Sequence, residues 1–292
     1  MTISPMDFLQ LFKYSFIQHA FLAAALMSIT CGIIGTYIVS RRMVFISGGI
    51  THASFGGIGM GYFLGFPPLA GAAIFAVLAA LTTENLTRRK VLRNDSIIAI
   101  MWSLGMALGI IFVYLTPGYA PNLMSFLFGS IITVTVMDLW LMFALAMTVS
   151  IFFALLFKSI LYVAFDEQFA RTRGIPVMLI NYLVIILVAL TVVLSIRIAG
   201  IILVLSILTI PQNISNLFTN RFSHIMIGSI ILGFFASALG LVISYYLDIP
   251  SGATIIFTLV VMYLAARLIK VVTFGRNIQI NKGLTDEPDR NH

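Results

Sequence analysis

Residues 25–65 read ALMSITCGIIGTYIVSRRMVFISGGITHASFGGIGMGYFLG, two long apolar runs that are separated by only a pair of arginines, Arg41 and Arg42. Each run is apolar around its whole circumference and extends over about twenty residues, the length of an α-helix that crosses a bilayer. Strands of a membrane β-barrel would alternate apolar and polar side chains over about ten residues. Because every backbone polar group inside a bilayer needs an internal partner, the two runs predict membrane-spanning helices.

Composition extends this prediction to the rest of the chain. Of its 292 residues 60% are apolar and 9% are charged, and the mean hydropathy is +1.08. A soluble domain carries about 25% charged residues, so lipid must solvate much of the surface of this chain. The formal charge of +7 lies in short connections between apolar runs, which argues against nucleic-acid binding. The single cysteine, Cys31, allows neither a disulfide framework nor a cysteine-based zinc site.

The apolar runs predict an all-α fold, a polytopic transmembrane helical bundle of about nine spans, with eight possible. Residues 121–136 are apolar but short, and they predict a half-span or an interfacial helix. The predicted spans cover residues 16–39, 44–64, 67–86, 96–116, 138–157, 177–196, 198–218, 224–246 and 250–270.

The basic residues predict the orientation of the bundle, because they collect on the cytoplasmic side of short loops. With nine spans and the N-terminus outside, all but two of the 17 lysines and arginines face the cytoplasm, and the exceptions are Lys13 and Arg197. The prediction is therefore an outside N-terminus, a cytoplasmic C-terminus and a single transmembrane domain over residues 1–274. The polar residues 275–292 predict a flexible cytoplasmic tail.

The longest cytoplasmic connection, residues 158–176, has the most informative polar pattern. Asp166 and Glu167 begin a short predicted helix, where acidic side chains suit the positive end of the helix dipole. Its apolar stripe and its terminating residues are Phe165, Phe169, Ala170, Gly174 and Pro176. Two interpretations stay open: an interfacial helix that lies on lipid, and a knob that docks into a groove of a partner protein.

This connection resembles the coupling segment of the zinc/manganese/iron family of ATP-binding-cassette permeases, whose pattern is F-D-x-x-x-A-x-x-x-G-hydrophobic-P. Here Phe165, Asp166, Ala170, Gly174 and Pro176 match that pattern. Further segments resemble the family in the same order, so that the resemblance covers roughly residues 16–270. They are residues 25–65, DSIIAIMWSLGMALGIIF at 95–112, SFLFGSIITVT at 125–135, SIRIAGIILVLSILTIPQNISNLF at 195–218 and ISYYLDIPSGATIIF at 243–257.

The resemblance implies the permease subunit of an ATP-driven importer of divalent metal ions, zinc, manganese or iron, in the bacterial inner (plasma) membrane. Such a permease forms a homodimer, binds cytoplasmic ATPase subunits and receives metal from an extracytoplasmic binding protein. It holds no covalently bound cofactor, and the divalent metal is its substrate. The chain lacks a G-x-x-x-x-G-K-[ST] phosphate loop, so ATP hydrolysis is expected in a partner subunit and the chain is not predicted to be an enzyme.

Two alternatives stay open. One is a permease of the same architecture for a chelated metal or another small substrate. The other is an ion-coupled secondary transporter, although such proteins usually place carboxylates near the middle of the membrane. No predicted span here has an acidic residue at its centre.

The predicted metal path centres on the second span. The family has a Gly-Asp-x-x-Ser-His motif there, whose Asp and His lie four residues apart and therefore on one helical face. The matching stretch is SGGITH at residues 47–52, in which His52 matches the histidine, Thr51 the serine and Gly48 the aspartate. Two uses of His52 stay open: a contact to substrate, or a packed side chain satisfied by a neighbour. Without the carboxylate we expect a shift in substrate or affinity, for example toward metal carried as a complex.

A second polar interruption lies in the seventh predicted span. Pro211 removes one hydrogen bond of the helix, and Gln212 and Asn213 follow it directly. The two amides either satisfy the freed backbone groups or face a water-filled path. Gln212 and Asn213 are therefore the next candidates for the substrate path after His52 and Thr51.

Overall fold

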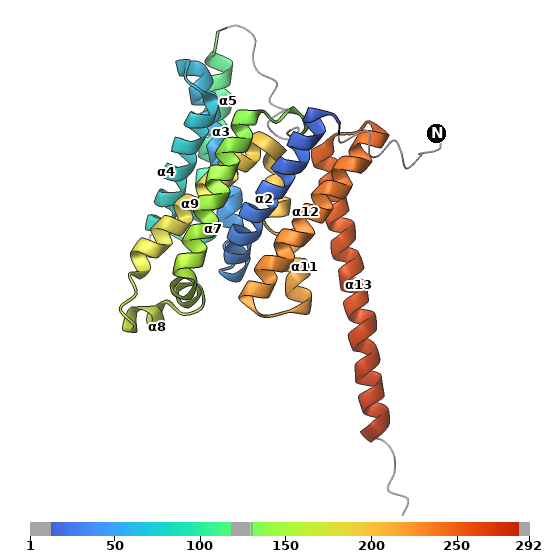
Figure 1. Ribbon diagram of the computed structural model, residues 1–292. Helices are drawn as coiled ribbons and strands as arrows, with labels where there is room; N and C mark the ends of the chain where they lie inside the picture. The colour runs from blue at the N-terminus through green and yellow to red at the C-terminus, as the bar shows by residue number, and fades with distance from the viewer. Residues whose placement is uncertain (1–12, 91, 118–128, 130, 286–292) are drawn as a thin grey trace, which may run out of the picture.

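The computed structural model describes residues 13–285 apart from residues 91, 118–128 and 130, and every regular element among them is a helix (Figure 1). Most helices pack side by side in one bundle, and the later part of α13 projects beyond it. Their bounds are α2 Ser15–Ser40, α3 Val44–Leu64, α4 Pro68–Arg88, α5 Asn94–Leu115, η1 Ile131–Thr133, α7 Val136–Phe165, α8 Glu167–Thr172, α9 Val177–Ala199, α10 Ile201–Ile207, α11 Ile210–Phe218, α12 Phe222–Leu247 and α13 Ser251–Thr285.

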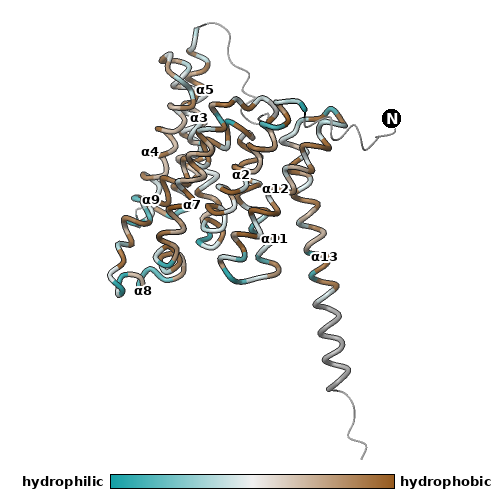
Figure 2. Tube along the Cα trace, viewed as in Figure 1, coloured by the Kyte–Doolittle hydropathy of each residue, from teal (hydrophilic) through white to brown (hydrophobic). Residues whose placement is uncertain are grey.

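Eight segments of the described chain are long and apolar enough to cross a membrane, and α10 together with α11 forms one of them. Figure 2 shows the same division, with hydrophobic residues along the helices and hydrophilic ones in the turns around α8 and between α11 and α12. The prediction of an all-α, polytopic transmembrane bundle is confirmed. The segment missing from the eight is α3, a 21-residue helix whose glycines, serines and histidine lower its hydropathy. The ninth span and the orientation of the termini stay predictions.

The helices differ in how deeply they lie in the bundle. In the most apolar part of α2 78% of the residues are buried, and in α9 the share is 61%, so these two helices lie at the centre together with α3, of whose 21 residues 14 are buried. In α5 and α13 the shares are only 28% and 22%. Large side chains such as Ile100 and Ile110 on α5 and Phe257 on α13 are exposed there. These outer faces meet lipid or another protein.

Glycine allows α3 to approach its neighbours at backbone distance. A Cβ atom at Gly57 would collide with the carbonyl group of Gly71 on α4, and one at Gly105 on α5 would collide with the backbone of Ala53 on α3. Small residues at such crossings are typical of helix packing inside membranes, where apolar burial alone does not hold helices together. The tight α3–α4–α5 unit fixes the position of the side chains that α3 and α5 present to each other.

Two helix ends differ from the sequence prediction. α7 extends to Phe165, but Leu156 has non-helical backbone angles (φ −105°, ψ 16°) that kink the helix next to the predicted span end at 157. The first part of the predicted connection 158–176 is therefore a second helical segment beyond this kink. α13 extends to Thr285, and the flexible cytoplasmic tail over residues 275–292 stays a prediction. Most of the predicted half-span 121–136 lies outside the described residues.

Candidate functional site

His52 lies on α3 with its imidazole stacked on the indole of Trp102 from α5. The two ring centroids are 3.9 Å apart and the ring planes differ by 9°, so the contact is face to face. The imidazole is half-buried, and its Nδ1 atom is buried without a hydrogen-bond partner. A buried polar atom of this kind is rare in folded proteins and calls for an explanation. A histidine with a purely structural role would have a hydrogen-bond partner at this atom, and Nδ1 of His52 has none among the described residues.

Gly48 lies one helical turn before His52 on the same face of α3. A Cβ atom at this position would lie 3.8 Å from Cζ3 of Trp102 and 3.8 Å from Cδ2 of Leu205, which is ordinary van der Waals contact. A methyl group therefore fits at position 48, whereas a carboxyl group would have to compete with the indole or the leucine. Within the described part of the chain no group of three or more His, Cys, Asp or Glu side chains could hold a metal ion.

Thr51 is adjacent to His52 in sequence but lies in a different environment. Its side chain is fully buried, and its hydroxyl group donates to the carbonyl oxygen of Ser47 at 2.6 Å. The carbonyl group of Thr51 in turn accepts from the hydroxyl group of Ser54 at 2.6 Å. The hydroxyl proton of Thr51 is thus used inside its own helix, and successive residues of a helix do not share a face.

Gln212 supports the break between α10 and α11. Its fully buried amide Nε2 donates to the carbonyl oxygen of Cys31 on α2 at 2.9 Å and to that of Ile207 at 3.2 Å. The carbonyl of Ile207 lies where the helix is interrupted and Pro211 offers no N–H group. The amide nitrogen therefore satisfies freed backbone, as one of its two predicted uses requires, whereas the buried Oε1 atom has no hydrogen-bond partner among the described residues.

Asn213 points away from Gln212. It is exposed, and its Nδ2 donates to the carbonyl oxygen of Thr209 at 2.8 Å. The structure therefore does not bring the two amides together: Gln212 faces α2 in the core, whereas Asn213 lies on the surface.

The short helix that the sequence predicts at Asp166 and Glu167 is present in the structure as α8. Asp166 is the N-cap and its side chain accepts the backbone N–H of Phe169 at 2.9 Å. Gly174 has a φ of +72° and ends the helix in the left-handed conformation that glycine adopts without strain. Ala170 is buried, while 65% of Phe165 and 40% of Phe169 are exposed. The helix is thus fixed to the bundle through Ala170 and presents Phe169 outward, beside the exposed Phe165 at the end of α7.

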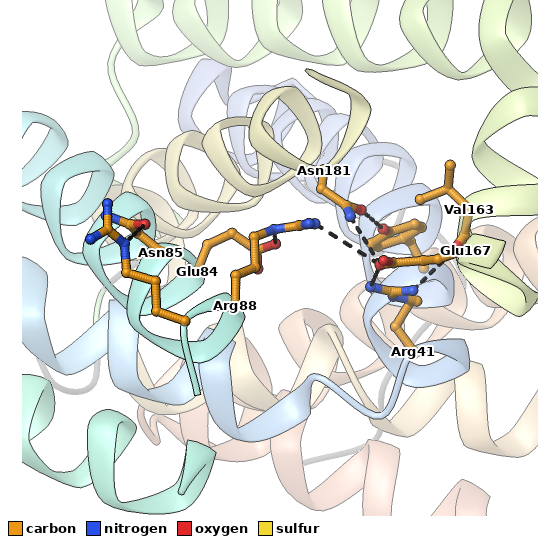
Figure 3. Close-up of polar contacts among 9 residues, drawn as sticks. Arg41, Glu84, Asn85, Arg88, Val163, Glu167 and Asn181 are labelled. Atoms are coloured by element: carbon orange, nitrogen blue, oxygen red, sulfur yellow. Dashed lines mark hydrogen bonds and ion pairs between the residues drawn. The ribbon is translucent and has the colours of Figure 1, made fainter. Parts of the chain in front are cut away.

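Glu167 ties α8 to three other helices (Figure 3). Its Oε1 atom accepts from Nη2 of Arg41 at the end of α2 at 2.7 Å and from Nδ2 of Asn181 on α9 at 3.0 Å. Nη2 of Arg88 at the end of α4 lies 4.0 Å away, and Nε of Arg88 pairs with Glu84 at 2.6 Å. We call Arg41, Glu84, Arg88, Glu167 and Asn181 the Glu167 cluster.

Electrostatics keeps the carboxyl group of Glu167 ionised. Burial alone would raise its pKa, but the hydrogen bonds from Arg41 and Asn181, with the positive charges of Arg41 and Arg88, lower the pKa below its usual range. Arg41 also donates through Nη1 to the carbonyl oxygen of Val163 near the end of α7 at 2.8 Å. The cluster therefore joins the ends of α2, α4 and α7, the start of α9, and α8.

Sequence reasoning identified α8 and His52 but neither of their main partners. The signal for Arg41 and Arg88 was their clustering at loop ends, and the pairing of Glu84 with Arg88 follows from their spacing on one helix. Trp102 gave no such signal, because its position opposite His52 depends on the rotation of α5 against α3.

Comparison with known proteins decides the family. The profile of the ABC 3 transport family matches residues 13–270. The chain belongs to this family. The membrane protein slr2045 of Synechocystis is 42% identical over 255 residues, which cover 87% of this chain and 91% of that protein. The manganese transport system membrane protein MntC of Halalkalibacterium halodurans is 32% identical over 247 residues, 85% of each chain.

A solved structure gives the same result. The structure of PsaBC from Streptococcus pneumoniae in complex with Fab superimposes with a TM-score of 0.79 at 30% identity, over 89% of this chain and 93% of that one. The predictions of a multi-pass permease of the ATP-binding-cassette type in the bacterial plasma membrane are confirmed. The alternative of an ion-coupled secondary transporter is not compatible with this family membership.

Proposed function

We propose that this permease imports a divalent metal ion, as a homodimer that binds two cytoplasmic ATPase subunits and receives its substrate from an extracytoplasmic binding protein. The observation that carries the proposal is the match to the ABC 3 transport family over residues 13–270, together with relatives of about one-third identity named for manganese transport. ATP hydrolysis belongs to the partner subunits, and the divalent metal is the substrate.

α8 receives the movement of the ATPase subunits. Phe165 and Phe169 offer an exposed apolar knob next to charged groups, and Phe169 also carries the guanidinium of Arg173 at 5.2 Å from its ring centroid. Such aromatic and arginine side chains are the usual anchors of a protein interface. The ion pair between Glu167 and Arg41 then passes a displacement of α8 to the end of α2, one of the most buried helices of the bundle. These contacts favour protein docking over the interfacial-helix interpretation.

His52 provides the substrate contact. Its unpartnered Nδ1 supports a ligand at this point, and two copies of the chain would supply two imidazoles to one path. Thr51 contributes by shaping α3 beneath His52, and Gln212 by supporting the α10–α11 break. Asn213, exposed on the surface, borders the path only if the second copy covers it.

The test uses the permease purified together with its ATPase in lipid nanodiscs. We expect a divalent metal to stimulate ATP hydrolysis, and the substitution His52→Ala to abolish that stimulation while the ATPase still copurifies. His224→Ala is the matched control, since that imidazole is exposed at the start of α12. An unchanged response in His52→Ala would refute the ligand assignment, and the absence of any metal response in the wild type would refute metal import.

A further inference from the structure

A groove lies beside α8, at the end of the bundle where α4 ends and α9 begins (Figure 1). Its volume is about 620 Å³, and Arg88 on α4, Arg171 on α8 and Tyr182 on α9 line it. The other lining side chains are apolar, among them Met178 and Leu179 at the start of α9. The groove thus combines two cationic groups with an apolar surface, and the proposed function uses neither Arg171 nor Tyr182.

Arg171 brings a positive charge to the groove that no carboxylate offsets. It lies four residues after Glu167 and therefore on the same face of α8. Phe169, which the proposed function assigns to the ATPase contact, lies on a different face. Oε1 of Glu167 already accepts from Arg41 and Asn181. Within the described part of the chain the guanidinium group of Arg171 forms no ion pair, so it is free to bind an anion.

The other two polar groups of the groove also have donors to spare. Arg88 uses Nε for Glu84 and places Nη2 4.0 Å from Glu167, while its Nη1 has no partner among the described residues. The hydroxyl group of Tyr182 likewise makes no hydrogen bond within this part of the chain. The Glu167 cluster contains two arginines and two glutamates, whose formal charges cancel, so Arg171 leaves the groove with a net positive charge. Guanidinium and hydroxyl donors of this kind bind phosphate oxygens.

The apolar side of the groove indicates which phosphate compound fits. Met178 is 59% exposed and Leu179 is 56% exposed, and Leu183 one turn later is 37% exposed. We call these three residues the apolar wall. They belong to the first turns of α9, a helix long and apolar enough to cross the membrane, so the wall extends from the groove into the depth of the acyl chains. A free phosphate ion makes no use of such a wall, whereas a phospholipid has a part for each side of the groove.

We propose that this groove binds an anionic phospholipid of the cytoplasmic leaflet. Arg171, Arg88 and Tyr182 donate to the headgroup phosphate, and the apolar wall contacts the first part of an acyl chain. Basic pockets between membrane helices on the cytoplasmic side recognise anionic headgroups in this way. The leaflet rests on the proposed function, which places α8 beside the ATPase subunits. A phosphate held by both arginines joins α8 to the end of α4, so the position of α8 depends on the lipids around it.

The experiment uses the permease–ATPase complex in nanodiscs of phosphatidylcholine with an increasing fraction of phosphatidylglycerol. Native mass spectrometry after transfer to detergent gives the fraction of complexes that retain each lipid. The wild type is expected to retain phosphatidylglycerol in preference to phosphatidylcholine. Arg171→Ala should weaken the apparent affinity for phosphatidylglycerol by about fivefold, the effect of one arginine near an anionic membrane surface. Arg171→Lys, which keeps the charge, should retain most of the affinity.

Arg221→Ala is the matched control, because Arg221 is an exposed arginine that precedes α12 and does not line the groove. It should retain phosphatidylglycerol as the wild type does. Equal retention of the two lipids by the wild type, or wild-type retention in Arg171→Ala, would overturn the proposal. Displacement of the lipid by inorganic phosphate at constant ionic strength would also overturn it, since the groove would then be a site for soluble anions.

A contact of Arg171 with the ATPase gives a different result from a lipid site. In that case Arg171→Ala would lose the ATPase during purification while its retention of phosphatidylglycerol stayed unchanged, and the lipid proposal would fall. Lipid retention requires neither metal nor ATP. Failure of the lipid preference therefore leaves metal import intact, and a complex that retains the lipid but shows no response to metal refutes metal import alone.

Discussion

The Glu167 cluster and the His52–Trp102 pair differ in how far their polar atoms are satisfied by hydrogen bonds. In the cluster the carboxylate of Glu167 accepts hydrogen bonds from Arg41 and Asn181 and lies near the guanidinium group of Arg88. In the pair a single stack holds the histidine, and Nδ1 has no partner. A satisfied network transmits movement because its members cannot move independently, whereas an unsatisfied polar atom is free to take a ligand. The comparison supports the proposal that the first region couples the permease to the ATPase subunits and that the second binds the substrate.

The largest effect is expected when Glu167, the common acceptor of the Glu167 cluster, is replaced. Glu167→Ala leaves the partly buried Arg41 and the buried Asn181 without their common acceptor, and an unpaired buried group costs about 1–3 kcal/mol. Metal uptake into proteoliposomes should fall by about tenfold or more, while ATP hydrolysis by the complex continues, because the proposed function places the nucleotide sites in the partner subunits.

Gln168→Ala is the control for this prediction, since Gln168 is exposed on the same short helix. It should leave the ratio of uptake to hydrolysis unchanged. If uptake and hydrolysis fall together in Glu167→Ala, the cluster holds the subunits together and does not transmit the movement.

The opposite behaviour is expected at His52. In His52→Phe a second aromatic ring keeps a face toward Trp102 and removes the unpartnered nitrogen. The free energy of unfolding should therefore stay within about 1 kcal/mol of the wild type or rise, while the metal response is lost. Thermal denaturation of the purified complex and its metal-stimulated ATPase activity measure the two quantities, and a marked loss of stability would make His52 a structural residue.

The contrast also explains which features the sequence could predict. Eight of the nine predicted spans, the N-cap Asp166 and the terminating Gly174 follow from local patterns and are found in the structure. Arg41 and Glu167 are 126 positions apart, and no periodicity indicates that they meet. Hydropathy indicates which segments enter the membrane but not the rotation of each helix about its axis. The sequence could therefore predict neither the separation of Gln212 from Asn213 nor the stacking of Trp102 on His52.

A smaller effect is expected at the start of α8. Asp166→Ala removes the acceptor of the Phe169 N–H group, and loss of an N-cap costs about 1 kcal/mol. The local cost falls on a helix of six residues that Glu167 and Ala170 still hold in place, so uptake should fall by less than in Glu167→Ala. Hydrogen exchange of the α8 amides measures the change directly, and Asp166→Asn, which restores an acceptor, should recover most of the protection.

The smallest effect is the dependence of the cluster on pH. The pKa of Glu167 lies below its ordinary value of 4.5 because Arg41, Asn181 and Arg88 favour the ionised form over the penalty of burial. A lowered pKa in the folded state contributes stability that is complete above pH 4.5 and is lost only as the pH falls through the lower, folded-state value. The melting temperature of the wild type should therefore exceed that of Glu167→Gln by a constant margin from neutral pH down to about 4.5. The margin should close below that pH, when the carboxylate of the wild type is protonated as well. A margin that stays constant or widens as the pH falls below 4.5 would mean that the pKa of Glu167 is not lowered in the folded state, and that the cluster does not hold α8 through charge.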